Sequence, residues 1–299
     1  MLNEFHWWQG VVEDRNDPKQ LGRVRVRCLG YHTENKVDLP TQDLPWAHPV
    51  QPITSAAMNG IGTTPLGLVE GTWVFGFFRD GENAQLPVIL GSIGGESVPL
   101  NNDNSGFRDP TGKYPLKEGP NVFSDTNTLA SGDSGLPIIN RQQNLDEMAQ
   151  HFGSMFTFAS ISEPAPRYDA EYPFNHVRFT ESGHVQEFDD TPGAERIHTQ
   201  HRSGTFEEFG PDGERVLKVV NRNYTAILGD DDVHVKGNAN IQVDGDTSLI
   251  LNGNVRLTVT DDLSVMVNGN FDLNTLGKID ITGPAGTSIR GFPIKLNSD

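Results

Sequence analysis

The clearest pattern in the chain is an alternation of apolar and polar residues near its C-terminal end. Of the 24 odd-numbered positions from 235 to 281, 21 are apolar or Gly. Of the 24 even-numbered positions from 236 to 282, 21 are polar. Because successive side chains of a β-strand point to opposite faces, this alternation predicts a continuous β-structure with one buried face.

An eight-residue repeat is superimposed on this alternation. The first of six consecutive repeats begins at Val235, and five of the six carry Gly two residues after their first position. These glycines are Gly237, Gly245, Gly253, Gly269 and Gly277. Because Gly followed by Asn or Asp favours a turn, each octad is predicted to form one strand and one bend. The remaining octad has Asp261 in place of Gly, and this residue either binds an axial ion or water or turns outward at a local bulge.

The repeat length favours an assembly of several chains. A single-chain β-helix needs roughly 18 residues per turn, so six octads would leave an open apolar end and unpaired edges. If three chains each contribute one strand per level, every octad completes a triangular layer. We therefore predict an intertwined homotrimeric triangular β-helix, or needle, over residues 235–299. Its predicted core and trimer interface are Val235, Ile241, Val243, Leu249, Leu251, Val255, Leu257, Val259, Leu263, Val265, Val267, Phe271, Leu273, Ile279 and Ile281. Strands of an ordinary sandwich are the alternative, but they do not keep a fixed octad spacing.

Residues 1–95 read as short strands separated by turns. Period-two alternation runs over 8–14 and 22–29, and apolar runs at 71–78 and 86–93 flank an Asp-Gly hairpin signal. Five or so short strands without a helical pattern predict a small closed barrel of the oligonucleotide/oligosaccharide-binding (OB) type, with a sandwich as the alternative. The fold class is therefore all-β.

The region between barrel and needle lacks the alternating pattern of strands. Residues 96–170 are rich in turn-forming residues and predict an extended linker, with a short helix at 140–150. Because so long an irregular segment is uncommon in a compact monomer, we expect it to wrap a partner or a sister chain. Residues 171–234 are assigned to the start of the needle.

The charge, the cysteine count and the apolar content of the chain exclude several classes of function. The 299 residues carry 23 Lys and Arg against 40 Asp and Glu, a net charge of −17, which argues against nucleic acid as a partner. The single cysteine, Cys28, excludes an intrachain disulfide and a multi-cysteine zinc site. The N-terminus lacks the pattern of a signal peptide, and no apolar run is long enough for a membrane span, so the chain is expected to be made as a soluble cytoplasmic protein.

Two groups of residues could be taken for catalytic or metal sites. His198 and His201 lie three residues apart, which on a strand places them on opposite faces, so solvated histidines are expected rather than a metal pair. Cys28 with His32 or His48 lacks an orienting third group, so a buried thiol and surface histidines are expected. No cofactor, metal site or catalytic residue is predicted.

Several motifs together resemble a known family. The chain is similar to the central spike proteins of contractile phage tails, that is, the T4-type baseplate hub protein with its lysozyme insert, and to the related VgrG spikes of type VI secretion. The resemblance rests on the octads and on the segments Gly67–Val74, Pro87–Ile93, Gly106–Pro115, Glu187–Ile197, Ser203–Thr205 and Pro211–Gly213.

This resemblance implies a non-enzymatic membrane-puncturing spike of the virion baseplate. Residues 96–170 are too few for a glycoside hydrolase fold, so the lysozyme activity is not carried over. A two-carboxylate glycosidase site could be proposed from four acidic residues, Glu181, Glu187, Asp189 and Asp190. These residues, however, lie in or near the motif that begins the needle. Surface or inter-chain hydrogen bonding is therefore expected of them. The alternatives are a VgrG-like secretion spike and an envelope-degrading or glycan-binding tail protein.

The resemblance also implies partners at both ends. A hub ring of the tail tube would hold the N-terminal barrels, and Trp7, Trp8, Arg23 and Arg25 are the predicted docking residues. Alternating arginines on a barrel strand can also bind nucleic acid, but residues 1–95 hold 10 acidic against 7 basic residues, so an acidic protein partner is preferred. No His follows His234 to bind a metal at the tip, so a PAAR-like tip protein is expected. Its predicted contacts are Phe292, Ile294 and Leu296.

Overall fold

The structure is a computed structural model, and it describes residues 5–57, 61–94, 105–114, 125–132 and 163–291. The chain divides into two compact units, Met1–Asn240 and Ile241–Asp299. The strands are β1 (His6–Asp14), β2 (Val24–Cys28), β3 (Trp46–Pro49), β4 (Trp73–Phe78), β5 (Pro87–Ser92), β6 (Asn175–Phe179), β7 (Val185–Asp189), β8 (Arg196–Gln200), β9 (Phe206–Phe209) and β10 (Arg215–Lys218). The helices are η1 (Thr41–Asp43), η2 (Gly81–Asn83) and α1 (Asp125–Ala130).

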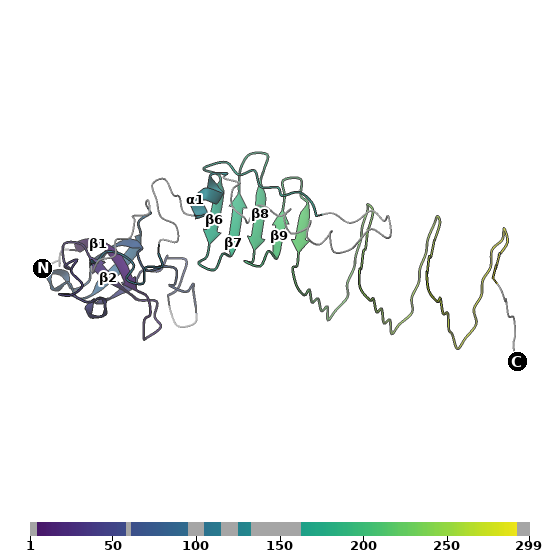
Figure 1. The fold of residues 1–299 in the computed structure, drawn as a ribbon, viewed down its shortest axis with the longest axis horizontal. Helices are drawn as coiled ribbons and strands as arrows, with labels where there is room; N and C mark the ends of the chain where they lie inside the picture. Colours follow the sequence, from purple (N-terminus) through teal and green to yellow (C-terminus); the bar gives the residue numbers. More distant parts are fainter. Residues whose placement is uncertain (1–4, 58–60, 95–104, 115–124, 133–162, 292–299) are drawn as a thin grey trace. The chain divides into compact units, whose positions relative to one another are not determined.

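The first five strands close into a barrel in the order β1-β2-β3-β5-β4 (Figure 1). β1 pairs antiparallel with both β2 and β4, while β3 runs parallel to β5. The closed OB-type barrel predicted from the strand pattern is therefore confirmed. Because a closed barrel has no free sheet edge, it resists unspecific strand addition. Its core consists of Trp8, Val12, Val24, Val26, Cys28, Ala47, Val74, Phe78 and Ile89.

Residues 105–114, which we call the strap, lie on the barrel. The Phe107 ring stacks on Trp73 with 6.4 Å between centroids and an interplanar angle of 13°. The carboxylate of Asp109 accepts hydrogen bonds from the backbone N–H groups of Thr111, Lys113 and Tyr114, which folds the strap into a tight turn. This stretch of the predicted linker is thus part of the barrel's covering.

A second sheet follows the barrel in the chain. Strands β6 to β10 form an antiparallel meander in the order β10-β9-β8-β7-β6 (Figure 1). Helix α1 packs against β6, where the Asn175 amide donates a hydrogen bond to the Leu129 carbonyl oxygen. The turn-rich composition of residues 96–170 did not predict α1, and the helix expected at 140–150 lies outside the described residues.

Residues 219–291 contain no strand. The extended backbone bends at 228–229, 236–237, 244–245, 253, 260–261, 268–269 and 276–277, so a bend recurs about every eight residues. Each bend lies at the Gly position of an octad, or at Asp261 where Gly is replaced. The bends thus follow the sequence repeat, whereas the β-helix itself stays a prediction because residues 219–291 form no strand pairs in the single chain. The boundaries of the four predicted regions likewise stay predictions.

Candidate assembly surfaces

A fully buried ion pair anchors the strap and a long loop to the barrel. The side chains of Glu13 and Arg27 are both 0% exposed, and Arg27 Nε lies 2.6 Å from Glu13 Oε1. Arg27 also donates hydrogen bonds to the carbonyl oxygens of Thr33, at 2.6 Å, and Leu39, at 2.8 Å. The Glu13 carboxylate also accepts hydrogen bonds from the Thr41 hydroxyl, at 2.7 Å, and from the backbone N–H of Phe107 in the strap, at 3.1 Å. One pair therefore connects two strands, the loop after β2 and the strap.

The arginines predicted to dock a hub are held by this chain's own residues. Arg23 is 9% exposed and donates to both carboxylate oxygens of Asp17, at 2.6 and 3.0 Å. The Arg23 guanidinium and nearby backbone N–H groups lower the pKa of Asp17 well below its usual value. Arg25 lies 4.5 Å from the ring centroid of Trp46 and 3.6 Å from the Asp14 carboxylate. Neither arginine is therefore free to attract an acidic partner.

The two predicted docking tryptophans point in opposite directions. Trp8 is 5% exposed and belongs to the barrel core, whereas Trp7 is 58% exposed. Trp7 lies beside Phe5 and Phe77, with 5.9 Å between the Trp7 and Phe77 centroids and 5.1 Å between Phe5 and Phe77. Phe75, two positions earlier on β4, is also exposed. We call Phe5, Trp7, Phe75 and Phe77 the aromatic face. The alternation of Phe75 and Phe77 in the sequence could have indicated it.

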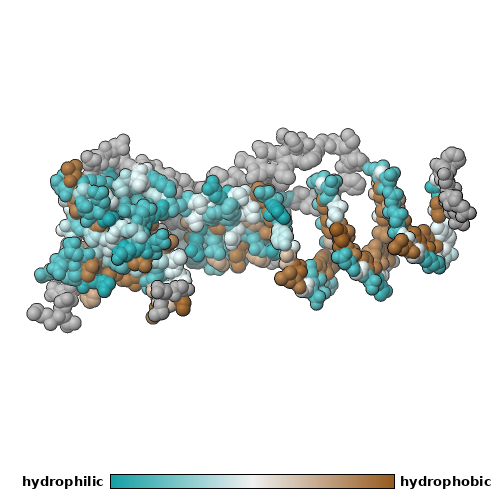
Figure 2. Space-filling view, turned by 90° about the horizontal axis from the view of Figure 1, so that it is seen from below, coloured by the Kyte–Doolittle hydropathy of each residue, from teal (hydrophilic) through white to brown (hydrophobic). Residues whose placement is uncertain are grey.

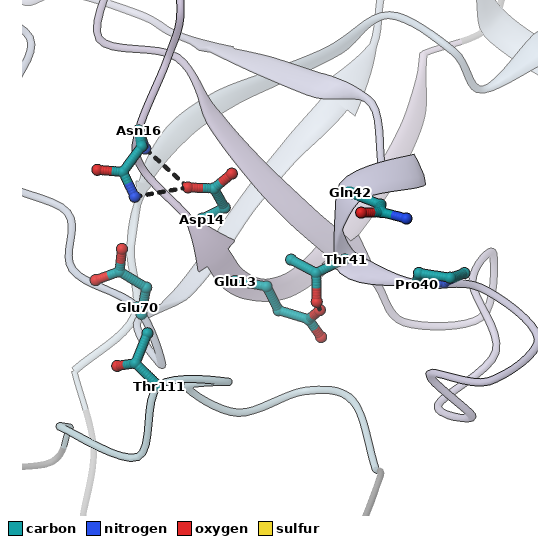
Figure 3. A pocket seen from close by; sticks show the side chains of 8 residues that line it. All are labelled: Glu13, Asp14, Asn16, Pro40, Thr41, Gln42, Glu70 and Thr111. Carbon is teal, nitrogen blue, oxygen red and sulfur yellow. Dashed lines mark hydrogen bonds between the residues drawn. The ribbon is translucent and has the colours of Figure 1, made fainter.

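A shallow acidic pocket lies where β1, η1 and the strap approach one another (Figure 3). Its lining is Glu13, Asp14, Asn16, Pro40, Thr41, Gln42, Glu70 and Thr111. Each of its carboxylates already contacts an arginine of this chain: Glu13 contacts Arg27, Asp14 contacts Arg25, and Glu70 contacts Arg15. The pocket is therefore a junction between barrel segments, and we assign it no ligand.

One face of the β6–β10 sheet buries charged side chains. Arg196 lies 2.8 Å from Glu187 and 3.2 Å from Glu208, and His198 Nδ1 lies 3.0 Å from Glu208. All four side chains are at most 4% exposed. The structure thus places His198 inside the protein, where a carboxylate and Gln200 contact its ring, instead of in solvent as expected. Glu187 is likewise buried within one chain and not on the surface.

The opposite face of this sheet presents an apolar row. Strand pairing aligns Phe188 with Ile197 and Ile197 with Phe209, so the three side chains lie side by side across β7, β8 and β9. They are 47%, 46% and 41% exposed. A half-exposed row of three large apolar side chains is typical of a surface that another molecule covers.

The other carboxylates considered for a glycosidase site lie on two separate turns of the β6–β10 sheet. Asp189 is 2% exposed and accepts hydrogen bonds from the N–H and hydroxyl of Thr191, which fixes the Asp-Asp-Thr-Pro-Gly turn. Asp190 is exposed on that turn, and Glu181 is exposed on the turn between β6 and β7. These carboxylates therefore do not converge on a cleft.

Cys28 and its neighbouring histidine do not form a nucleophile pair. Burial raises the pKa of the Cys28 thiol to about 12, which suppresses the reactive thiolate. Nδ1 of His32 accepts a hydrogen bond from the Cys28 backbone N–H, and burial lowers the pKa of the His32 ring. His48 lies on β3 with an exposed side chain and a pKa that desolvation also lowers. The structure thus agrees with the expectation that Cys28 is a buried, unreactive thiol.

The predicted needle core is solvent-exposed in the single chain. The fifteen predicted core residues are between 43% exposed, at Val259, and 91% exposed, at Ile241. Figure 2 shows hydrophobic residues, in brown, recurring along the bent C-terminal part of the chain. Within the described residues 221–282, no hydrogen bond joins two backbone groups. The predicted tip contacts Phe292, Ile294 and Leu296 lie outside the described residues.

The described part of the chain offers neither a metal site nor a membrane-spanning helix. In the ranges given above, no three His, Cys, Asp or Glu side chains are grouped to hold a metal ion. The helices among these residues are all too short or too polar to cross a membrane.

Comparison with known proteins identifies relatives. Residues 30–166 match the family model of the Gp5 N-terminal OB domain. Protein Gp5 of Vibrio phage KVP40 is 41% identical over 278 residues, which cover 82% of this chain and 64% of that protein. The pre-baseplate central spike protein Gp5 of Enterobacteria phage T4 is 45% identical over 154 residues, which cover 48% of this chain and 26% of that protein. The chain thus matches less than two thirds of either relative's length. These matches show that the chain is similar in sequence to Gp5 proteins, one of which is named a pre-baseplate central spike protein.

Proposed function

We propose that this chain is a structural spike protein of a contractile phage tail baseplate, and that its C-terminal octads form a trimeric needle. The observation that carries the proposal is the octad repeat, with its bend at every Gly position of the octads and its exposed apolar side chains. The name of the T4 relative, a central spike protein, supports the same role. In this role the chain resides in the virion baseplate, and the needle enters the host envelope when a sheath contracts.

Three copies of the chain would solve two problems of the isolated octads. Fifteen apolar side chains would leave water, each contributing about 1.5–3 kcal/mol when fully buried. The backbone groups of residues 221–282, which form no backbone–backbone hydrogen bond with one another in one chain, would pair with strands of the sister chains, as β-structure requires. The apolar row of Phe188, Ile197 and Phe209 lies on the strands that precede the octads and would be covered by the same sister chains.

The two ends of the spike would bind different proteins. At the barrel, the aromatic face replaces Trp8, Arg23 and Arg25 as the surface for a hub ring of the tail tube, and of the predicted docking residues only Trp7 belongs to it. The partner surface would accordingly be apolar. At the C-terminal end, a PAAR-like tip protein would contact Phe292, Ile294 and Leu296, as the family resemblance implies. The needle requires no cofactor, and its acidic surface disfavours adhesion to anionic membranes.

The spike would act mechanically and not as a hydrolase. Glu187 is bound by Arg196 and Asn175, and Asp189 is held in its turn by Thr191, so neither carboxylate can reach a polysaccharide. We expect the purified chain to produce no clearing in peptidoglycan zymography, with hen egg-white lysozyme as the positive control. A cleared band at the chain's own mass, retained after Glu187→Gln but lost on heat denaturation, would show a catalytic site elsewhere in the chain.

The oligomeric state tests the needle directly. Light scattering coupled to size exclusion is expected to give the mass of three 32.8 kDa chains, about 98 kDa, because the octads bury their apolar face only in the trimer. The mass should not change on dilution, since intertwined chains separate only by unwinding. A monomer at all concentrations would contradict the proposed needle.

A further inference from the structure

Three segments far apart in the sequence meet at Arg15, in the loop after β1. Its guanidinium donates two hydrogen bonds to the Glu181 carboxylate, at 2.7 and 3.0 Å. Its Nε lies 3.3 Å from Glu70, whose side chain is only 7% exposed. Glu181 also accepts a hydrogen bond from Lys113 Nζ at 2.9 Å. The barrel, the strap and the turn between β6 and β7 are thus connected through one arginine.

An aromatic ring supports the same cluster. Tyr114, at the end of the strap, is 7% exposed. The Arg15 guanidinium carbon lies 6.0 Å from the Tyr114 ring centroid, and Lys113 Nζ lies 4.7 Å from it. Both cations are within reach of a cation–π interaction with this ring. Arg15 therefore contacts the strap through Tyr114 as well as the sheet through Glu181.

We propose that Arg15, Glu70, Lys113, Tyr114 and Glu181 form an ionic clasp that fastens the strap and the β6–β7 turn to the barrel and that opens at high ionic strength. An isolated ion pair at a protein surface contributes little. Here the arginine and carboxylate are bidentate, a second cation shares the carboxylate, and one acidic partner is buried, which are the conditions under which such pairs matter.

We expect the clasp to open when the salt concentration rises, and not when the pH changes near neutrality. The hydrogen bonds from Arg15 and then Lys113 lower the pKa of Glu181 to about 2, and the bond to Glu181 raises that of Arg15. The stabilising effect of ionised Glu181 is therefore present above the ordinary glutamate pKa and is lost only as the pH falls towards 2. Arg15 and Glu181 are 33% and 38% exposed, and screening shortens from about 10 Å at 0.1 M salt to about 3 Å at 1 M. Glu70, Asp109 and Lys113 are the other charged groups that face the pair.

Hydrogen exchange of the full chain tests the clasp. The strap and turn contain hydrogen-bonded amides that can report opening: those of Lys113 and Tyr114, bonded to Asp109, and that of Gly183, bonded to Thr180. At low salt, Arg15→Gln is expected to speed exchange in both segments several-fold. Salt at about 1 M should bring the unmodified chain to the same rates and leave the variant almost unchanged. Glu181→Gln is a second variant, made on the other side of the contact, and it should have the same effect.

A matched control separates the clasp from charge in general. Arg215 and Glu207 form an exposed pair at 2.6 Å that lies wholly within β9 and β10. Glu207→Gln removes a carboxylate of similar exposure and should leave exchange in 109–114 and 180–184 unchanged. The clasp is refuted if both Arg15→Gln and Glu181→Gln leave these segments protected at low salt, or if Arg15→Gln responds to salt as strongly as the unmodified chain.

Discussion

Replacing Arg27 by Met is expected to lower the free energy of unfolding of the barrel by about 3–5 kcal/mol, because it leaves the fully buried Glu13 carboxylate without its counter-ion. The substitution also removes the hydrogen bonds to the Thr33 and Leu39 carbonyl oxygens, which hold the loop after β2. Urea denaturation followed by tryptophan fluorescence measures this effect. All four tryptophans, at positions 7, 8, 46 and 73, lie in the barrel, so the signal reports this region alone.

Two control variants show whether the loss of stability comes from the buried ion pair. Arg79→Met removes a cation from an exposed position of the same barrel and should change its stability by no more than about 0.5 kcal/mol. The double variant Glu13→Leu with Arg27→Met removes both charges and should be more stable than Arg27→Met alone, because no uncompensated charge stays buried. A loss below about 1 kcal/mol for Arg27→Met would show that water reaches Glu13 in the folded barrel.

Sequence alternation predicted most of the barrel but not the use of its charged residues. The apolar runs located β1, β2, β4 and β5, since a half-buried strand shows a period of two. The four-residue strand β3 has no such run and was not predicted. The same alternation could have shown that only one of Trp7 and Trp8 faces outward. The pairing of Arg23 with Asp17 depends on how a turn folds back onto a strand, which residue spacing alone does not reveal.

The β6–β10 sheet shows a second limit of sequence patterns. A period of two indicates that a strand has two different faces, but it does not say which face the chain itself covers. An apolar interior would be expected to hold Phe188 and Ile197, yet the structure buries Glu187 and His198 because Arg196 and Glu208 compensate them. For the octads the repeat predicted the bends at the Gly positions, whereas the bend at Asp261, where Gly is replaced, was not predicted. Their apolar face is exposed in one chain, and in the proposed needle sister chains cover it.

Replacing Leu257 by Asp is expected to abolish the trimer. Leu257 is an odd octad position between the bends at Gly253 and Asp261, and it is 73% exposed in the single chain. In the proposed needle three copies meet near the axis. The substitution would remove three buried leucines, together about 5–9 kcal/mol, and would bring three carboxylates close together in an apolar interior. Light scattering should then show the 32.8 kDa chain, and its octads should be rapidly cleaved by protease.

The neighbouring even position supplies the control. Thr258→Asp introduces the same charge one residue later, where the side chain would point away from the needle axis into water. This variant should keep the trimer mass and the protease resistance of the unmodified chain. Equal loss of the trimer in both variants would mean that the odd positions are not the inner face, whereas an unchanged trimer in Leu257→Asp would mean that the chains associate elsewhere. A difference between these adjacent residues follows from the proposed needle, because its odd-numbered side chains face the axis and its even-numbered side chains face water.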